Sequence, residues 1–100
     1  AKLGQKICKE ETLAVIVKIN KALIEEIKID PVEFTVLKND RINAKMLEGW
    51  NIYFNAAGDI DWQITKLQLV LEKEIPEDKR NNLEYINVRF TKVYYRYQQE

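Results

Sequence analysis

The sequence predicts an α+β fold in which two helices pack on one face of a mostly antiparallel sheet of about five strands. Apolar residues recur at spacings of three and four in segments 10–27 and 60–75, which is the period of an amphipathic helix. In segments 32–54 and 85–97 they alternate with polar residues, as in strands with one buried face. The expected order is helix, three strands, helix, two strands, within a single domain spanning residues 1–100.

The first helix is expected from about Glu10 to Ile27, and residues 1–9 are left unassigned. It should stop before Asp30-Pro31, because proline disfavours a helical conformation in the residue that precedes it. Asn20 interrupts its apolar stripe. The residues expected to face the core are Leu13, Ile16, Val17, Leu23, Ile24 and Ile27.

Three alternating segments follow, and they predict an antiparallel meander with one buried face. Two short polar turns separate them, Lys38-Asn39-Asp40-Arg41 and Glu48-Gly49. The residues expected on the buried face are Val32, Phe34 and Val36, then Ile42, Ala44 and Met46, then Trp50, Ile52 and Phe54.

The second helix follows a loop at residues 55–58. Asp59 or Asp61 can cap it, because a short carboxylate accepts hydrogen bonds from the free backbone amides of the first turn. Pro76 ends the helix, and residues 77–82 form a solvated connector with room for one helical turn. Its expected core stripe is Ile60, Ile64, Leu67, Leu71 and Ile75.

Two closely spaced strands end the predicted fold. In the first, Ile86, Val88 and Phe90 alternate with Tyr85, Asn87 and Arg89. Thr91-Lys92 separates it from the last strand and lacks glycine or asparagine, so it matches a tight hairpin turn poorly. A bulge, or one continuous bent strand, is the alternative.

Composition argues against several function classes. Sixteen basic and sixteen acidic residues give a formal net charge of zero, whereas a general nucleic-acid binder carries a basic excess. The chain has no histidine and no glycine-rich phosphate loop, and its one cysteine, Cys8, has no neighbouring base. No apolar run approaches the length that spans a membrane. We therefore expect no enzyme, no cofactor and no metal site.

The strand at residues 93–97 is the main candidate for a binding site, because it is aromatic and carries a positive charge. A terminal strand of this kind either pairs inside the domain or offers its edge to a partner. The alternative without a binding role is that Tyr95 shares a core face with Val93, while Tyr94 and Arg96 are ordinary surface residues. The candidate partner-binding residues are Arg89, Phe90, Val93, Tyr94, Tyr95, Arg96 and Tyr97.

Other conspicuous side chains have simpler interpretations. Arg89 is expected to pair with an acid on the same sheet face rather than with a partner, and Lys66 to be a solvated helix lysine. Asp59 and Asp61 make a poor calcium loop, so helix capping is favoured. Trp50 is expected in the core, and Trp62 is expected to be half-exposed at a contact surface.

Four short motifs resemble the extracytoplasmic β domain of the FtsQ/DivIB cell-division family. They are Gly49-Trp50-Asn51-Ile52-Tyr53-Phe54, Lys66-Leu67, Tyr85-Ile86-Asn87-Val88-Arg89-Phe90 and Val93-Tyr94-Tyr95-Arg96, and the resemblance covers roughly residues 10–97. The family usually has aspartate where this chain has Asn87, and the link between its last two strands is about one residue longer. Because the chain begins with Ala1, we expect a fragment without the family's cytoplasmic tail, transmembrane helix and POTRA domain.

The resemblance implies a non-enzymatic role at the outer face of the bacterial plasma membrane, at the division septum. Family members tether the division proteins FtsB and FtsL, and a partner segment adds to the edge of the final strand. Membrane anchoring would belong to parts that this chain lacks. One alternative is self-association through the same edge. Another is single-stranded nucleic-acid binding, with a stacking platform made of Phe90, Lys92, Tyr94, Tyr95, Arg96 and Tyr97.

Overall fold

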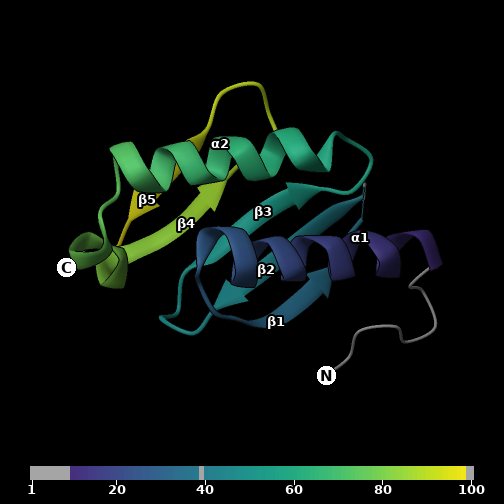
Figure 1. Ribbon diagram of the computed structural model, residues 1–100, viewed down its shortest axis with the longest axis horizontal. Helices are drawn as coiled ribbons and strands as arrows, with labels where there is room; N and C mark the ends of the chain where they lie inside the picture. The colour runs from purple at the N-terminus through teal and green to yellow at the C-terminus, as the bar shows by residue number, and fades with distance from the viewer. Residues whose placement is uncertain (1–9, 39, 99–100) are drawn as a thin grey trace.

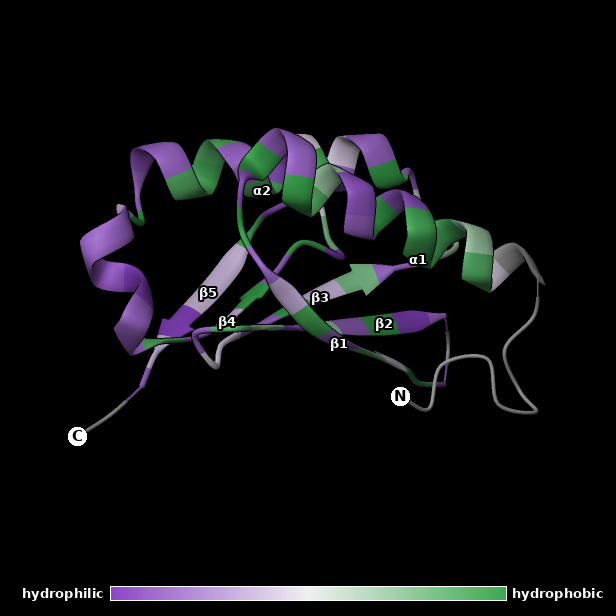
Figure 2. Ribbon diagram, turned by 60° about the horizontal axis from the view of Figure 1, so that its bottom comes forward, coloured by the Kyte–Doolittle hydropathy of each residue, from purple (hydrophilic) through white to green (hydrophobic). Residues whose placement is uncertain are grey.

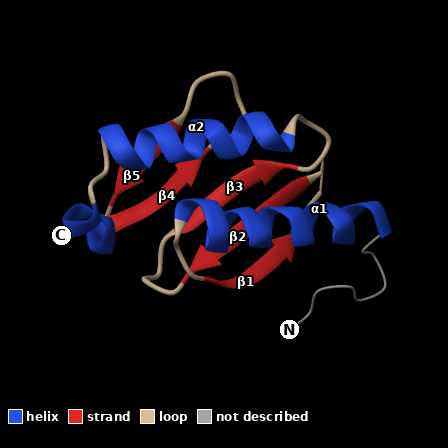
Figure 3. Cartoon of the chain, viewed as in Figure 1, coloured by secondary structure: helices blue, strands red, loops and turns tan. Residues whose placement is uncertain are grey.

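A computed structural model describes residues 10–38 and 40–98, in which both long helices cover one face of a five-stranded sheet (Figures 1 and 2). This confirms the predicted α+β class and the order of its elements (Figure 3). Cys8 and Asn39 lie outside the described residues. The elements are helix α1 (Glu10–Ala22), its continuation as a π-helical turn η1 (Leu23–Ile27), strands β1 (Pro31–Val36), β2 (Arg41–Met46) and β3 (Asn51–Asn55), helix α2 (Ile60–Lys73), the 3-10 turn η2 (Glu77–Asn82), and strands β4 (Leu83–Asn87) and β5 (Tyr94–Tyr97).

The strands lie in the sheet in their chain order, β1-β2-β3-β4-β5. Neighbours are antiparallel except for β3 and β4, which run parallel. Parallel neighbours need a long crossover connection, and α2 supplies it across the covered face of the sheet (Figure 1). The order leaves β1 and β5 as the two edges of the sheet.

The core lies between the helices and the sheet, where the alternating residues of the strands point, as predicted. All five predicted stripe residues of α2 are buried, from Ile60 to Ile75. Asp59 is the N-cap of α2, and its side chain accepts a hydrogen bond from the backbone N–H of Trp62 at 3.0 Å. Residues 77–82 form the 3-10 helix η2, which is longer than the one helical turn expected of the connector.

The apolar stripe of the first helix was predicted wrongly in part. Leu13, Val17 and Ile24 are exposed, and the core takes Ile19 and Ala22 in addition to Ile16 and Leu23. Two stripes with helical spacing lie side by side on this helix, and the sheet and α2 reach only the one that contains Ile19. Since successive residues are about 100° apart around a helix, the other stripe projects from its flank.

Two strand predictions were also wrong. Val32 is 55% exposed, because the pairing of β1 with β2 shifts register between Pro31 and Glu33. Phe90 is 52% exposed, because β4 ends at Asn87 and residues 88–93 form a loop. The link to the last strand is therefore neither a bulge at Thr91-Lys92 nor one bent strand.

Candidate partner-binding site

Strand β5 pairs with β4 on one side, and among the described residues no strand pairs with its other side. Of the two alternatives for this strand, the structure shows an edge position at the end of the sheet. Such an edge presents backbone amides and carbonyls to a partner strand. The opposite edge, β1, is blunted by Pro31 and by its irregular register, two features that oppose strand addition. Along β5 the Cα partners are Tyr94 with Asn87, Tyr95 with Ile86, Arg96 with Tyr85 and Tyr97 with Leu83.

The four residues of β5 alternate between the two faces of the sheet. Tyr95 and Tyr97 are half-buried against the core on the helix side, with their rings edge to face at a centroid distance of 5.9 Å. Tyr94 and Arg96 are exposed on the other face, and Arg96 lies 3.8 Å from an oxygen of Glu84. The expectation that Tyr95 faces the core and that Tyr94 and Arg96 lie on the surface is therefore confirmed.

The same alternation bears on the nucleic-acid alternative. Of the proposed stacking platform, Tyr95 and Tyr97 point toward the helices, whereas Tyr94 points away from them. The ring of Phe90 meets that of Tyr94 edge to face, at 6.3 Å and 77°. The structure thus does not bring the platform residues together on one face, and single-stranded binding requires a continuous row of open ring faces.

Arg89 has no carboxylate within 4.0 Å among the described residues, so the expected ion pair with a neighbouring acid is not formed there. Its backbone N–H and its Nε both donate to Oδ1 of Asn87, at 3.1 and 3.2 Å. Its guanidinium carbon lies 4.9 Å from the centroid of the Phe90 ring. These contacts fix the guanidinium while leaving its two terminal nitrogens for an anionic partner.

Arg41 is held in the same way, although the sequence reasoning did not single it out. Its Nε donates to Oδ1 of Asn43 at 3.0 Å, and its guanidinium carbon lies 4.2 Å from the centroid of Tyr53. Tyr53 in turn stacks on Tyr85 from β4, at 5.2 Å and 21°. The alternation of Arg41 and Asn43 with the buried Ile42 is the signal that could have placed Arg41 on the uncovered face.

Arg41 begins β2 and Arg89 follows the end of β4, so the two arginines come from the chain on either side of β3. Arg41 pairs with Asn55 across the β2–β3 ladder. The β3–β4 ladder ends with Tyr53 and Asn87, and beyond it the backbone N–H and carbonyl of Asn55 bond to the side chain of Gln63. The 3.1 Å hydrogen bond from the Val88 N–H to the Tyr53 carbonyl shows that the chain follows β3 as far as Val88.

Lys66 is not the solvated helix lysine that the sequence suggested. The residue is 8% exposed, and its Nζ donates a hydrogen bond to the backbone carbonyl of Phe90 in the β4–β5 loop. The Nζ also lies 5.8 Å from the ring centroid of Trp62. Desolvation by burial lowers the pKa of Lys66. The prediction failed because this loop, distant in sequence, covers the side chain.

The other candidates have structural roles. Trp50 is completely buried and donates from Nε1 to Glu48, as expected of a core residue, and Trp62 is 52% exposed. Asp61 pairs with Lys18 at 3.2 Å. Among the residues that the structure describes, no group of three or more histidine, cysteine, aspartate or glutamate side chains could hold a metal ion.

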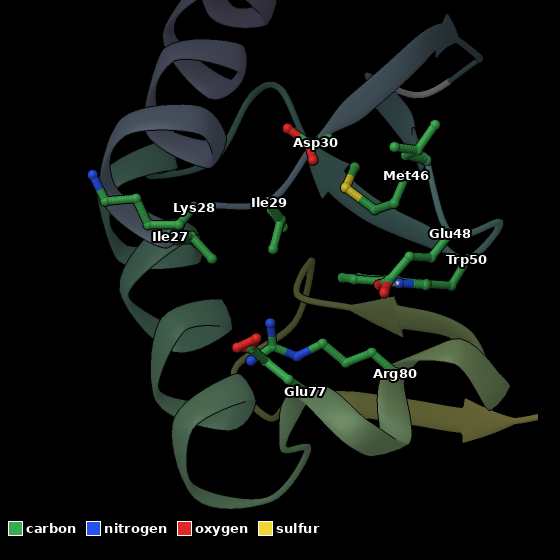
Figure 4. Close-up of a pocket in the computed structure, with 10 residues that line it drawn as sticks. Ile27, Lys28, Ile29, Asp30, Met46, Glu48, Trp50, Glu77 and Arg80 are labelled. Atoms are coloured by element: carbon green, nitrogen blue, oxygen red, sulfur yellow. Dashed lines mark hydrogen bonds between the residues drawn. The ribbon is translucent and has the colours of Figure 1, made fainter.

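A pocket of about 550 Å³ lies away from β5, between η1, the β2–β3 turn and η2 (Figure 4). Its polar groups already serve the fold: Arg80 donates to the carbonyls of Ile75 and Leu71 at 3.2 and 3.4 Å, and Glu48 accepts from Trp50. The lining also includes Lys28, Asp30 and Glu77, whose mixed charges select no single ligand class.

No protein-family model matches the chain, and no curated protein matches it. Within residues 10–38 and 40–98, no helix is both long and apolar enough to cross a membrane. The likeness to the FtsQ/DivIB family therefore rests on the four sequence motifs.

Proposed function

We propose that this chain is a non-enzymatic scaffold domain of the bacterial divisome that binds FtsB/FtsL-type proteins by adding a partner strand to β5. The observation that carries the proposal is the contrast between the two sheet edges. β5 has no paired neighbour on its outer side among the described residues. Its ladder with β4 shifts register between Leu83 and Tyr85, so the extra residue lies on β4, whereas the extra residue between Pro31 and Glu33 lies on the edge strand β1 itself. The resemblance of residues 85–90 and 93–96 to the FtsQ/DivIB motifs gives the partner class.

Side chains along the edge give the proposed interaction its specificity. A strand paired with β5 places alternate side chains beside Tyr95 and Tyr97 on the helix side, and beside Tyr94 and Arg96 on the uncovered face. Arg89, fixed by Asn87, lies in the loop that leads into β5. Carboxylates of the partner suit such a guanidinium, because a two-pronged pairing is strong and directional. Tyrosine and arginine are also frequent binding anchors.

The cellular setting in this proposal follows from the resemblance. The domain would lie on the extracytoplasmic face of the plasma membrane at the division septum. A single-pass parent protein would anchor it there, through parts outside this chain. Its role would be to hold partners in place, so no catalytic residue and no cofactor are assigned.

The test is a titration of nitrogen-15-labelled chain with the extracytoplasmic segment of the FtsB-like protein from the same organism. Amide shifts concentrated in residues 88–97, with residues 31–36 unchanged, would support strand addition at β5. Spectra of the free chain at several concentrations provide the control for self-association through the same edge. A well-dispersed spectrum that does not change at millimolar segment would contradict the proposal.

A further inference from the structure

Lys66 occupies an environment that disfavours its charge. It is nearly buried on α2, and no carboxylate of the described residues lies within 4.0 Å of its ammonium group. Its contacts are the carbonyl of Phe90 and, at 5.8 Å, the ring of Trp62. Burying an ammonium without a counter-ion costs free energy, and an apolar side chain of similar length would avoid that cost. The lysine must therefore supply something that an apolar residue lacks, namely a charged hydrogen-bond donor.

That donor holds the loop that carries three of the candidate binding residues, Arg89, Phe90 and Val93. The carbonyl of Phe90 belongs to the peptide that joins Phe90 to Thr91, so fixing it fixes the backbone from which the Phe90 side chain leaves. On the sheet side, the loop is held by the Val88 N–H on Tyr53 and by the Arg89 N–H on Asn87, each at 3.1 Å. On the helix side, Lys66 completes the support.

We infer that Lys66 is a positioning residue for partner binding: its ammonium holds the Phe90 carbonyl and so sets the direction in which Arg89 and Phe90 face a partner. The partner in this inference rests on the proposed function, whereas the effect on the loop does not. A hydrogen bond from a charged donor is stronger and more directional than one from a neutral donor, which suits a loop without regular pairing.

Lys66→Met tests the inference, because methionine keeps the unbranched chain and removes the donor. Lys73→Met is the matched control, since Lys73 is an exposed lysine in the last turn of the same helix. We expect Lys66→Met to unfold at a denaturant concentration no lower than wild type, because a buried charge has been removed. We also expect shifted and faster-exchanging amides at residues 89–93, and an affinity for the FtsB-like segment lower by on the order of tenfold.

Lys66→Arg serves as the conservative variant, because it restores a charged donor, and we expect it to recover part of the loop protection and of the affinity. Unchanged loop amides in Lys66→Met, or equal loosening of the loop in Lys73→Met, would overturn the inference. So would wild-type affinity in Lys66→Met. If the wild-type chain itself does not bind the segment, the proposed function fails, and the amides of residues 89–93 still decide the role of Lys66.

Discussion

The hydroxyl of Tyr95 donates a hydrogen bond to Oε1 of Glu74 at 3.0 Å, and this contact joins the edge strand to the C-cap of α2. The hydrogen bond is the main reason that the pKa of Tyr95 lies above its ordinary value of 10.0; partial desolvation and the negative charge of Glu74 act in the same direction. The outer strand is thus tied to the helix layer at its centre, while Lys66 holds the loop that leads into it.

This contact predicts a pH dependence of stability at the alkaline end. Because the folded-state pKa of Tyr95 is raised, the folded chain keeps the phenol proton where the unfolded chain releases it. The stabilisation is complete below the unfolded pKa and is lost as the pH rises through the folded one. Urea unfolding from about pH 8 to about pH 11 should therefore show a steeper alkaline loss in wild type than in Tyr95→Phe. Parallel curves would contradict this assignment.

Gln63 should be a strong contributor to stability. Its buried side chain accepts from the N–H of Asn55 at 2.8 Å and donates to the carbonyl of the same residue at 2.9 Å. Gln63→Leu would leave the Asn55 N–H unpaired, whereas the Asn55 carbonyl would keep the hydrogen bond from the Gly58 N–H at 3.1 Å. The expected cost is about 1–3 kcal/mol in the free energy of unfolding. The matched control is Gln68→Leu, at a half-buried position on the same helix, which should change that free energy by much less. Equal losses in the two variants would rule out the pairing as the cause.

The two aspartates at the start of α2 should differ in importance. Asp59 caps the helix through the Trp62 N–H, whereas Asp61 makes an exposed ion pair with Lys18. Asp59→Ala is expected to cost about 1 kcal/mol of unfolding free energy. Asp61→Ala should cost a few tenths at most, because exposed pairs contribute about 0–1 kcal/mol. Chemical denaturation of both variants measures these two losses of unfolding free energy. A larger loss in Asp61→Ala than in Asp59→Ala would show that the capping assignment is wrong.

Arg89 should affect affinity far more than stability. Arg89 is half-buried, and its guanidinium contacts Asn87 and Phe90 but no carboxylate of the described residues. Arg89→Ala should therefore weaken binding of the FtsB-like segment by about tenfold or more. Lys45→Ala, an exposed cation of the same sheet face on β2, is the control for general charge. Isothermal titration calorimetry at two salt concentrations measures the affinity of each variant for the segment. Equal effects from the two variants would indicate non-specific attraction in place of a site at Arg89.

Much of the fold could be predicted from local periodicity. The stripe from Ile60 to Ile75 and the alternation in β2 and β3 are strong patterns, and each has one interpretation. Asp59 and Asp61 were both reasonable caps, and only the observed backbone of the first turn selects Asp59. The sequence indicated a last strand at residues 93–97 but left open whether it pairs inside the domain or forms an edge, because strand order depends on contacts between distant segments.

The missed features depend on contacts between segments that lie far apart in the sequence. Lys66 is buried because the loop at residues 88–93 folds over it, and nothing near position 66 signals this. Arg41 gains its support from Tyr53, on the next strand. The first helix carries two apolar stripes, and only the path of the sheet decides between them. Val32 is exposed because of a register shift between β1 and β2, and the alternating sequence of β1 gives no sign of that shift.

The parallel junction between β3 and β4 has a consequence for how the domain opens. Three residue pairs, beginning with Asn51 and Tyr85, make up this ladder, and the connection between the two strands runs through α2. The meander β1–β3 and the β4–β5 hairpin share one core but meet along this short ladder. We therefore expect the hairpin to open at less than the full free energy of unfolding. A partner bound to β5 would favour the state in which β4 is paired with β3, by mass action. The hairpin would therefore open less often as more of the chain is bound.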